Sequence, residues 1–172
     1  MIQLTDHLIE EAKLYANRSA NYLSARNSFH DGSHESRVQK MFEGKLGEKI
    51  FKTWLLDNRI PFTEDFTSYK NADNYDFIVG GKTIDIKTKI KDYDYKILEI
   101  KDTFDTRPKD IYIAVRLYLG TMEGEIEGGV SRQKMKEINR IVNLGYGDDY
   151  AIVEEELTPI ETIKDYLLKQ TK

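Results

Sequence analysis

Hydrophobic positions in the first third of the chain recur with the period of an α-helix. Residues 4–24 place apolar side chains at helical spacing, and a second apolar stripe runs through residues 38–58. The polar segment 27–36 between them has no periodicity and is predicted to be a loop. Pro61 prevents the second helix from continuing. The chain is therefore predicted to begin with two amphipathic helices.

Beyond residue 62 the pattern changes to the short apolar runs that are typical of strands. Residues 75–79 and 82–89 flank Gly80-Gly81, a two-residue signal for a tight hairpin. Further strands are predicted at residues 110–119, 125–130 and 150–153. Ser131 is a candidate N-cap for a helix over residues 132–143, and Thr158-Pro159 opens a last helix that ends near Gln170. These elements predict an α/β fold with a central mixed β-sheet flanked by helices.

The composition is that of a globular protein, and it excludes several kinds of chemistry. The chain has 172 residues, of which 40% are hydrophobic and 33% charged, so one domain with a real core is expected. The absence of cysteine excludes disulfides, thiolate metal sites and a cysteine nucleophile. No apolar run is long enough to cross a bilayer, so no membrane association and a cytoplasmic location are expected.

The net charge of −4 argues against a surface that is basic everywhere. However, basic residues outnumber acidic ones in residues 13–52, whereas residues 148–165 are strongly acidic. A nucleic-acid partner is therefore compatible with the sequence if it meets a local basic cleft.

The predicted hairpin places charged side chains together. With a turn at Gly80-Gly81, Asp76 would lie opposite Asp85, and Lys87 would share their face, while Ile84 and Ile86 would point into the core. Two facing carboxylates repel each other unless a proton or a cation lies between them. A hard divalent cation such as Mg²⁺ is the usual partner, and Lys87 beside it would stabilise charge on a phosphate or orient a water molecule.

This arrangement resembles the active-site motif of the PD-(D/E)XK (restriction-endonuclease-like) nuclease superfamily. Asp76 supplies the first acid, and Asp85-Ile86-Lys87, followed by Thr88, supplies the second part of the motif after the turn. Tyr75 stands in place of the motif's proline, and the second acid is Asp where Glu is commoner. The preceding helix carries acids within residues 43–48, where the superfamily often has one. Glu48 fits best, with Glu43 as the second candidate.

The resemblance implies a fold and a domain organisation. It implies a restriction-endonuclease-like core with an added N-terminal helix, in one nuclease-like domain over residues 1–172. Within it, residues 1–37 would form the N-terminal helical extension and loop, 38–145 the catalytic core, and 146–172 a C-terminal strand and helix.

The resemblance also implies a metal site. Mg²⁺, for which Mn²⁺ would substitute, would be held by Asp76, Asp85 and the backbone carbonyl of Ile86, with Glu48 on the helix. Water would attack the phosphorus in line and leave a 5′-phosphate and a 3′-hydroxyl.

Each of these features also has a purely structural interpretation. The hairpin charges would then keep a solvated strand soluble, and Glu48 would pair with lysines along its own helix. Lys87, Lys89 and Lys91 alternate and would line one face, either against phosphates or in solvent. The tyrosines, among them Tyr93, Tyr95, Tyr112 and Tyr118, would stack on bases or simply pack.

Other chemistry has weaker support. His30 and His34 are four residues apart, but Gly32 lies between them and no third ligand is evident. Gly124, Gly128 and Gly129 are not followed by the Lys-Ser/Thr of a phosphate-binding loop, which argues against an NTPase.

Two functions follow from the sequence. The first is a Mg²⁺-dependent DNA endonuclease of the restriction, phage or junction-resolving type. It would act as a homodimer, because a double-strand cutter needs two active sites. The second is a catalytically silent nuclease-fold subunit that binds DNA or serves in assembly.

Overall fold

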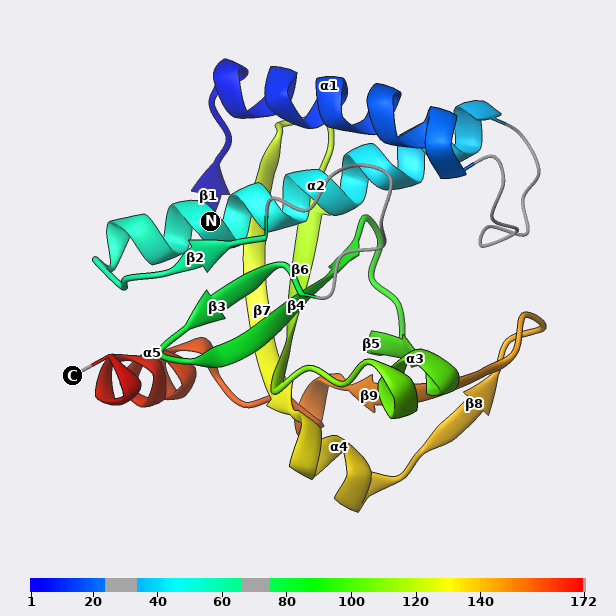
Figure 1. The fold of residues 1–172 in the computed structure, drawn as a ribbon, viewed down its shortest axis with the longest axis vertical. Coiled ribbons are helices and arrows are strands. Elements are labelled where there is room, and N and C mark those ends of the chain that lie inside the picture. The colour runs from blue at the N-terminus through cyan, green and yellow to red at the C-terminus, as the bar shows by residue number, and fades with distance from the viewer. Residues whose placement is uncertain (24–33, 66–74, 172) are drawn as a thin grey trace.

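The computed structural model describes residues 1–23, 34–65 and 75–171 (Figure 1). The helices are α1 (Asp6–Leu23), α2 (His34–Asp57), α3 (Lys101–Thr106), α4 (Arg132–Ile138) and α5 (Ile160–Gln170), with one 3-10 turn, η1 (Glu154–Glu156). The strands are β1 (Ile2–Gln3), β2 (Thr63–Glu64), β3 (Phe77–Val79), β4 (Lys82–Lys89), β5 (Tyr95–Ile100), β6 (Ile111–Tyr118), β7 (Glu123–Ser131), β8 (Ile141–Asn143) and β9 (Asp148–Val153).

The strands form two sheets. Six of them make a mixed sheet in the order β1-β7-β6-β4-β3-β2, in which β4 and β6 are parallel and all other neighbours are antiparallel. The strands β5, β9 and β8 form a second, antiparallel sheet. The predicted fold class, an α/β fold with a central mixed sheet flanked by helices, is confirmed.

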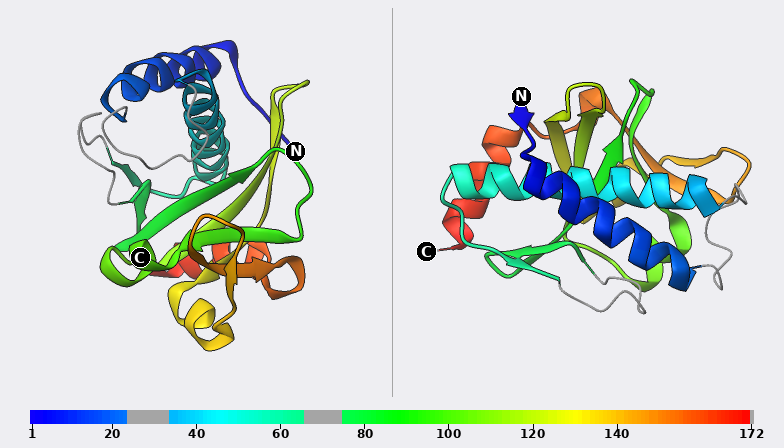
Figure 2. Two further views of the ribbon diagram at one scale, coloured as in Figure 1. Left: turned by 90° about the vertical axis from the view of Figure 1, so that its right-hand side faces the viewer. Right: turned by 90° about the horizontal axis from the view of Figure 1, so that it is seen from above.

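The main hydrophobic core lies between the six-stranded sheet and α2. Helix α2 lies between α1 and the sheet, and α1 crosses over it on the outer side (Figure 2). Leu46, Ile50 and Phe51 of α2 are fully buried and belong to one cluster with Ile84 and Ile113 of the central strands. The apolar stripe of the second predicted helix is therefore the face that packs on the sheet.

A second core covers the opposite face of the same sheet. Tyr112 and Ala114 of β6 point to this side and are buried against Ile97 of β5, Ile152 of β9 and Phe104 of α3. Alternate residues of β6 thus belong to two cores, which explains why its apolar run is continuous. Asp85 and Lys87 of β4 lie on this face and are partly buried.

The short strands β1, β2 and β8 were not predicted, and three larger differences concern the helices and β5. Helix α2 begins at His34, so part of the predicted loop 27–36 is helical, and residues 27–33 lie outside the described residues. Helix α4 ends at Ile138, well before the predicted residue 143, because Asn139 adopts a left-handed conformation with φ of 50°. The third difference is residues 95–106, for which no element was predicted and which form β5 and α3.

Candidate active site

The β3–β4 hairpin forms as predicted. Phe77 pairs with Ile84, and the two-residue turn consists of Gly80 and Gly81, whose φ angles are 55° and 76°. Glycine adopts these positive angles without the strain that a Cβ would bring. The register of the hairpin is therefore fixed by its turn.

Alternation along β4 places Asp85, Lys87 and Lys89 on the side away from the main core. Ile84 is fully buried in that core, whereas Asp85 is level with Tyr112 of the neighbouring strand, on the face covered by the second sheet. Lys87 Nζ lies 2.8 Å from Asp85 Oδ2 and forms a second ion pair with Glu99 of β5. Asp85 and Lys87 thus share one face, as predicted, and a third charged residue joins them.

This ion-pair cluster lies largely out of contact with water. Glu99 is 3% exposed, and Asp85 Oδ2 is buried with no hydrogen-bond partner among the described residues, only its ion pair with Lys87. Burial by itself would lower the pKa of Lys87, but Asp85 and Glu99 raise it well above its ordinary value. Burial raises the pKa of Glu99, and Lys87 opposes that rise. The ammonium group of Lys87 is therefore held in its charged form between two carboxyl groups.

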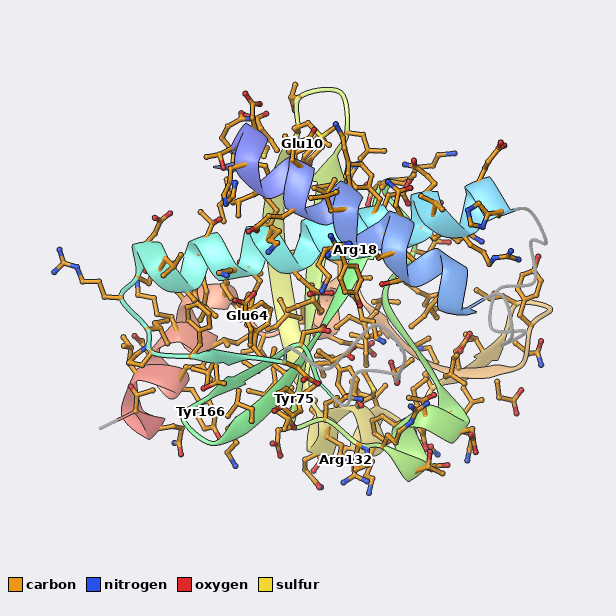
Figure 3. All side chains as sticks on the ribbon, turned by 45° about the horizontal axis from the view of Figure 1, so that its top comes forward. Glu10, Arg18, Glu64, Tyr75, Arg132 and Tyr166 are labelled. Atoms are coloured by element: carbon orange, nitrogen blue, oxygen red, sulfur yellow. The ribbon has the colours of Figure 1, made fainter. Side chains whose placement is uncertain are left out.

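Asp76 departs from the predicted pairing. Regular pairing in the hairpin stops at Phe77, and the backbone N–H of Asp76 donates to the carbonyl of Ile84, 2.9 Å away. The carboxylate of Asp76 instead accepts a hydrogen bond from the backbone N–H of Ile86, at 2.6 Å. Asp76 and Asp85 are therefore neighbours without being a directly opposed ladder pair. Tyr75, labelled in Figure 3, marks the point where the chain enters this segment.

The electrostatic environment of Asp76 is unfavourable for a carboxylate. Burial raises its pKa well above the ordinary value, and the negative charges of Glu48 and Asp85 raise it further. The hydrogen bond from the N–H of Ile86 and the positive charge of Lys45 act in the opposite direction. The charges of Glu48 and Asp85 thus both act on Asp76.

Helix α2 supplies Glu48 because it approaches β4 closely at Gly47. A Cβ built on Gly47 would lie only 1.9 Å from Oγ1 of Thr88, so any other residue would require Thr88 or the helix to shift. Glu48 follows directly, and it forms an ion pair with Lys45, whose Nζ lies 4.0 Å from the ring centroid of Tyr15 in α1. The close approach allowed by Gly47 therefore brings an acid of the helix to the hairpin.

The second candidate helix acid, Glu43, has a different neighbour. Its Oε1 accepts a hydrogen bond from Nε2 of Gln39, at 2.8 Å on the exposed side of α2. Of the two helix acids, Glu48 is the one whose charge acts on Asp76. The structure therefore favours Glu48.

The donor atoms suit a hard divalent cation, although they are not arranged as a metal site. Carboxylate oxygens of Asp76, Asp85 and Glu48, with the backbone carbonyl of Ile86 nearby, are the ligands that Mg²⁺ and Mn²⁺ take in proteins. Within residues 1–23, 34–65 and 75–171, however, no group of three or more His, Cys, Asp or Glu side chains has metal-holding geometry. Lys87 occupies the position beside Asp85 that a metal ion would take. Metal binding there would require the ion pair between Lys87 and Oδ2 of Asp85 to break.

The remaining candidates from the sequence lie in different surroundings. Lys89 follows Lys87 on the same face of β4; burial and the charge of Lys87 lower its pKa, and its Nζ is 5.6 Å from the ring centroid of Tyr93. Lys91 lies beyond the end of β4 and is exposed, so the predicted row of three lysines is reduced to two on the strand. His34 is exposed at the start of α2, and His30 lies outside the described residues.

Glu99 is the site residue that the sequence did not reveal. It lies in β5, two residues after the buried Ile97, in a strand that had not been predicted. An acid at the inward-facing position of an apolar alternation, as in Tyr-Lys-Ile-Leu-Glu-Ile, is the one signal that could have identified it.

Comparisons with known proteins do not guide the assignment. Comparison with models of known families, with curated proteins and with solved structures finds no match. In the described part of the chain, no helix combines the length and the apolar character needed to span a membrane. What this chain does must therefore be inferred from the side chains gathered at the β3–β4 hairpin.

Proposed function

We propose that this protein is a Mg²⁺-dependent endonuclease that hydrolyses phosphodiester bonds in DNA. The observation that carries the proposal is the gathering of Asp76, Asp85 and Lys87 on one hairpin, with Glu48 approaching from α2. The same residue types in the same order make up the PD-(D/E)XK motif that the sequence resembles, and a mixed sheet flanked by helices is compatible with a restriction-endonuclease-like core.

The electrostatics of the site support a bound cation. Asp76 has a raised pKa because it is buried near two further carboxyl groups, so ionising all three costs free energy that a divalent cation would offset. Asp76, Asp85 and Glu48 would hold the ion with the backbone carbonyl of Ile86. Bound Mg²⁺ would supply a Lewis acid for the phosphate and a water molecule of lowered pKa.

Lys87 is the group of this site that can act on developing negative charge. Its ammonium is kept protonated by Asp85 and Glu99, and it would donate to a non-bridging phosphate oxygen as charge accumulates there. If Asp85 held the cation, Glu99 would remain as the partner of Lys87. Glu99 therefore acts through Lys87 as a positioning residue. Attack in line on the phosphorus would leave a 5′-phosphate and a 3′-hydroxyl.

The proposal is tested by nicking of supercoiled plasmid DNA. Wild type should nick the plasmid with Mg²⁺ or Mn²⁺ and stop when a chelator is added. Asp85→Asn should lose this activity, while the matched control Asp102→Asn, at an exposed position of α3, should keep it. Nicking that continues in chelator, or that survives in Asp85→Asn, would contradict the assignment.

One observation favours a second candidate, a nuclease-fold subunit that binds DNA or assembles without cutting it. The ion pair between Lys87 and Asp85, together with the absence of a preformed metal geometry in the described residues, is what a silent site would also show. Metal-independent DNA binding without nicking under any divalent cation would select this candidate. Homodimerisation, expected for a double-strand cutter, is tested by sedimentation with and without a palindromic duplex.

A further inference from the structure

A cavity lies away from the candidate active site. It has a volume of about 490 Å³ and opens between the start of β4, the end of β7, and helices α4 and α5. None of the candidate active-site residues lines it. Lys82 in its wall precedes Asp85 by three residues, which corresponds to roughly 10 Å along a strand. Cavities of this size hold small molecules rather than single ions.

The walls of the cavity are fixed by hydrogen bonds that the protein makes with itself. Gly129 and Thr158 exchange backbone hydrogen bonds of 3.0 and 2.7 Å, which hold the segment before α5 against β7. The backbone N–H of Arg132 donates to the carbonyl of Asp110 at 2.9 Å. Asp110 Oδ2 in turn accepts from the N–H and the hydroxyl of Thr83, at 2.8 and 3.0 Å. The cavity is therefore largely preformed.

The cavity wall carries an excess of positive charge. Lys82, Arg132 and Lys136 line it, and none of them forms an ion pair with another described residue. The lining also contains one acid, Asp110, whose Oδ2 accepts from Thr83, so cations outnumber acids there by three to one. Three cations around one concave surface favour a ligand with more than one negative charge.

The guanidinium group of Arg132 lies over an aromatic ring and donates no hydrogen bond to another described residue. Its guanidinium carbon lies 5.5 Å from the ring centroid of Phe104, and its Nε is buried with no hydrogen-bond partner within the described residues. A buried donor without an acceptor costs free energy that a bound anion would recover. The planar donor set of arginine matches the oxygens of a phosphate group.

The other side of the cavity is apolar. Ile111, Val130 and Ile163 form the lining there, and the ring of Tyr166 is 41% exposed beside them. Figure 3 labels Arg132 and Tyr166, from α4 and α5, on the same lower side of the molecule. A ligand that satisfies both sides combines a phosphate with a flat ring.

We infer that this cavity binds a small phosphorylated ring compound of the nucleoside-monophosphate class. The phosphate lies among Arg132, Lys136 and Lys82, and the ring lies against Tyr166 and the apolar lining. The inference does not rest on the proposed nuclease activity, because the two sites share no residue.

Calorimetric titration of the full chain with AMP, in the presence of a chelator, tests this site. Wild type should bind AMP, should bind inorganic phosphate at least about tenfold more weakly, and should not bind adenosine measurably. Arg132→Gln should weaken AMP binding about tenfold or more, since a charge-assisted hydrogen bond is lost. Lys136→Gln, at an exposed position where the fold is not at risk, should also weaken it.

Two controls separate this site from general charge effects and from the hairpin. Lys134→Gln removes the same charge from α4 outside the cavity lining and should leave the affinity for AMP unchanged. Asp85→Asn should also leave it unchanged. The inference is overturned if wild type does not bind at about 10 mM AMP, if phosphate binds as tightly as AMP, or if either control weakens binding as much as Arg132→Gln does.

Discussion

Replacing Lys87 by methionine tests the most enclosed part of the site, independently of any activity. Methionine has a similar length and carries no charge, so Asp85 and Glu99 lose the cation that they share. Removing one partner from a buried ion pair typically costs about 3–5 kcal/mol. Because the side chain of Lys87 is 25% exposed and that of Glu99 only 3%, we expect the lower end, about 3 kcal/mol.

This loss is large enough to measure by thermal unfolding. For a chain of this size, 1 kcal/mol changes Tm by about 2–4 °C, so Lys87→Met should lower Tm by about 6–12 °C without metal. The double variant Lys87→Met/Glu99→Gln also removes the Glu99 carboxylate, which has no cationic partner once Lys87 is replaced, and it should recover part of the lost Tm. A change of less than about 2 °C in the single variant, or a further fall in the double variant, would refute the reasoning.

The same variant should show a defined pH dependence. Burial already holds the pKa of Glu99 above its ordinary 4.5, and Lys87 only opposes this rise. When the pKa of a carboxyl group is higher in the folded state than in the unfolded state, its protonation stabilises the fold. This stabilisation is complete at pH values below the unfolded-state pKa and is lost as the pH rises through the folded-state pKa. The destabilisation by Lys87→Met should therefore be larger at pH 8 than at pH 5, and circular-dichroism melts at the two pH values check this.

Three further substitutions probe the surroundings of the site and the fold. Gly47→Ala would place a methyl group against Thr88, so the urea midpoint should fall by the equivalent of about 1–3 kcal/mol; an unchanged midpoint would mean that α2 does not approach β4 closely. Glu48→Gln should strongly reduce nicking, and a rate close to wild type would remove Glu48 from the site. The bidentate ion pair with Arg140 lowers the pKa of Glu156 below its ordinary value of 4.5. The ion pair therefore stabilises the fold at pH values above 4.5, and this stabilisation is lost as the pH falls. Glu156→Gln should cost about 1 kcal/mol at pH 7 and almost nothing near pH 3, and equal costs at both pH values would count against the pair.

The local features of the site could be predicted because they depend on short-range rules. A pair of glycines between two alternating runs fixes the turn, the turn fixes the register, and alternation then puts Asp85 and Lys87 on one face. Likewise Ser131 caps α4 as expected, since its hydroxyl accepts from the N–H of Lys134.

The rest depends on contacts between distant parts of the chain. Glu99 reaches Lys87 only because β5 pairs with β9, some fifty residues further along the chain, and places its inward face against the six-stranded sheet. Asp76 does not continue the regular strand pairing, because the N–H of Ile86 donates to its carboxylate. Rules for backbone pairing do not consider a side chain as the acceptor. Local periodicity alone predicts neither the contact between Glu99 and Lys87 nor the one between Asp76 and Ile86.

We propose that the unfavourable gathering of these carboxyl groups serves catalysis. Asp76→Asn tests it most directly, since the amide oxygen can still accept from the N–H of Ile86 while the charge near Glu48 and Asp85 is gone. Metal-free Asp76→Asn should unfold at the same temperature as wild type or a higher one. Its Mg²⁺-dependent nicking rate, measured on the same preparation, should fall by about a hundredfold or more. Nicking close to the wild-type rate by this folded variant would contradict the account.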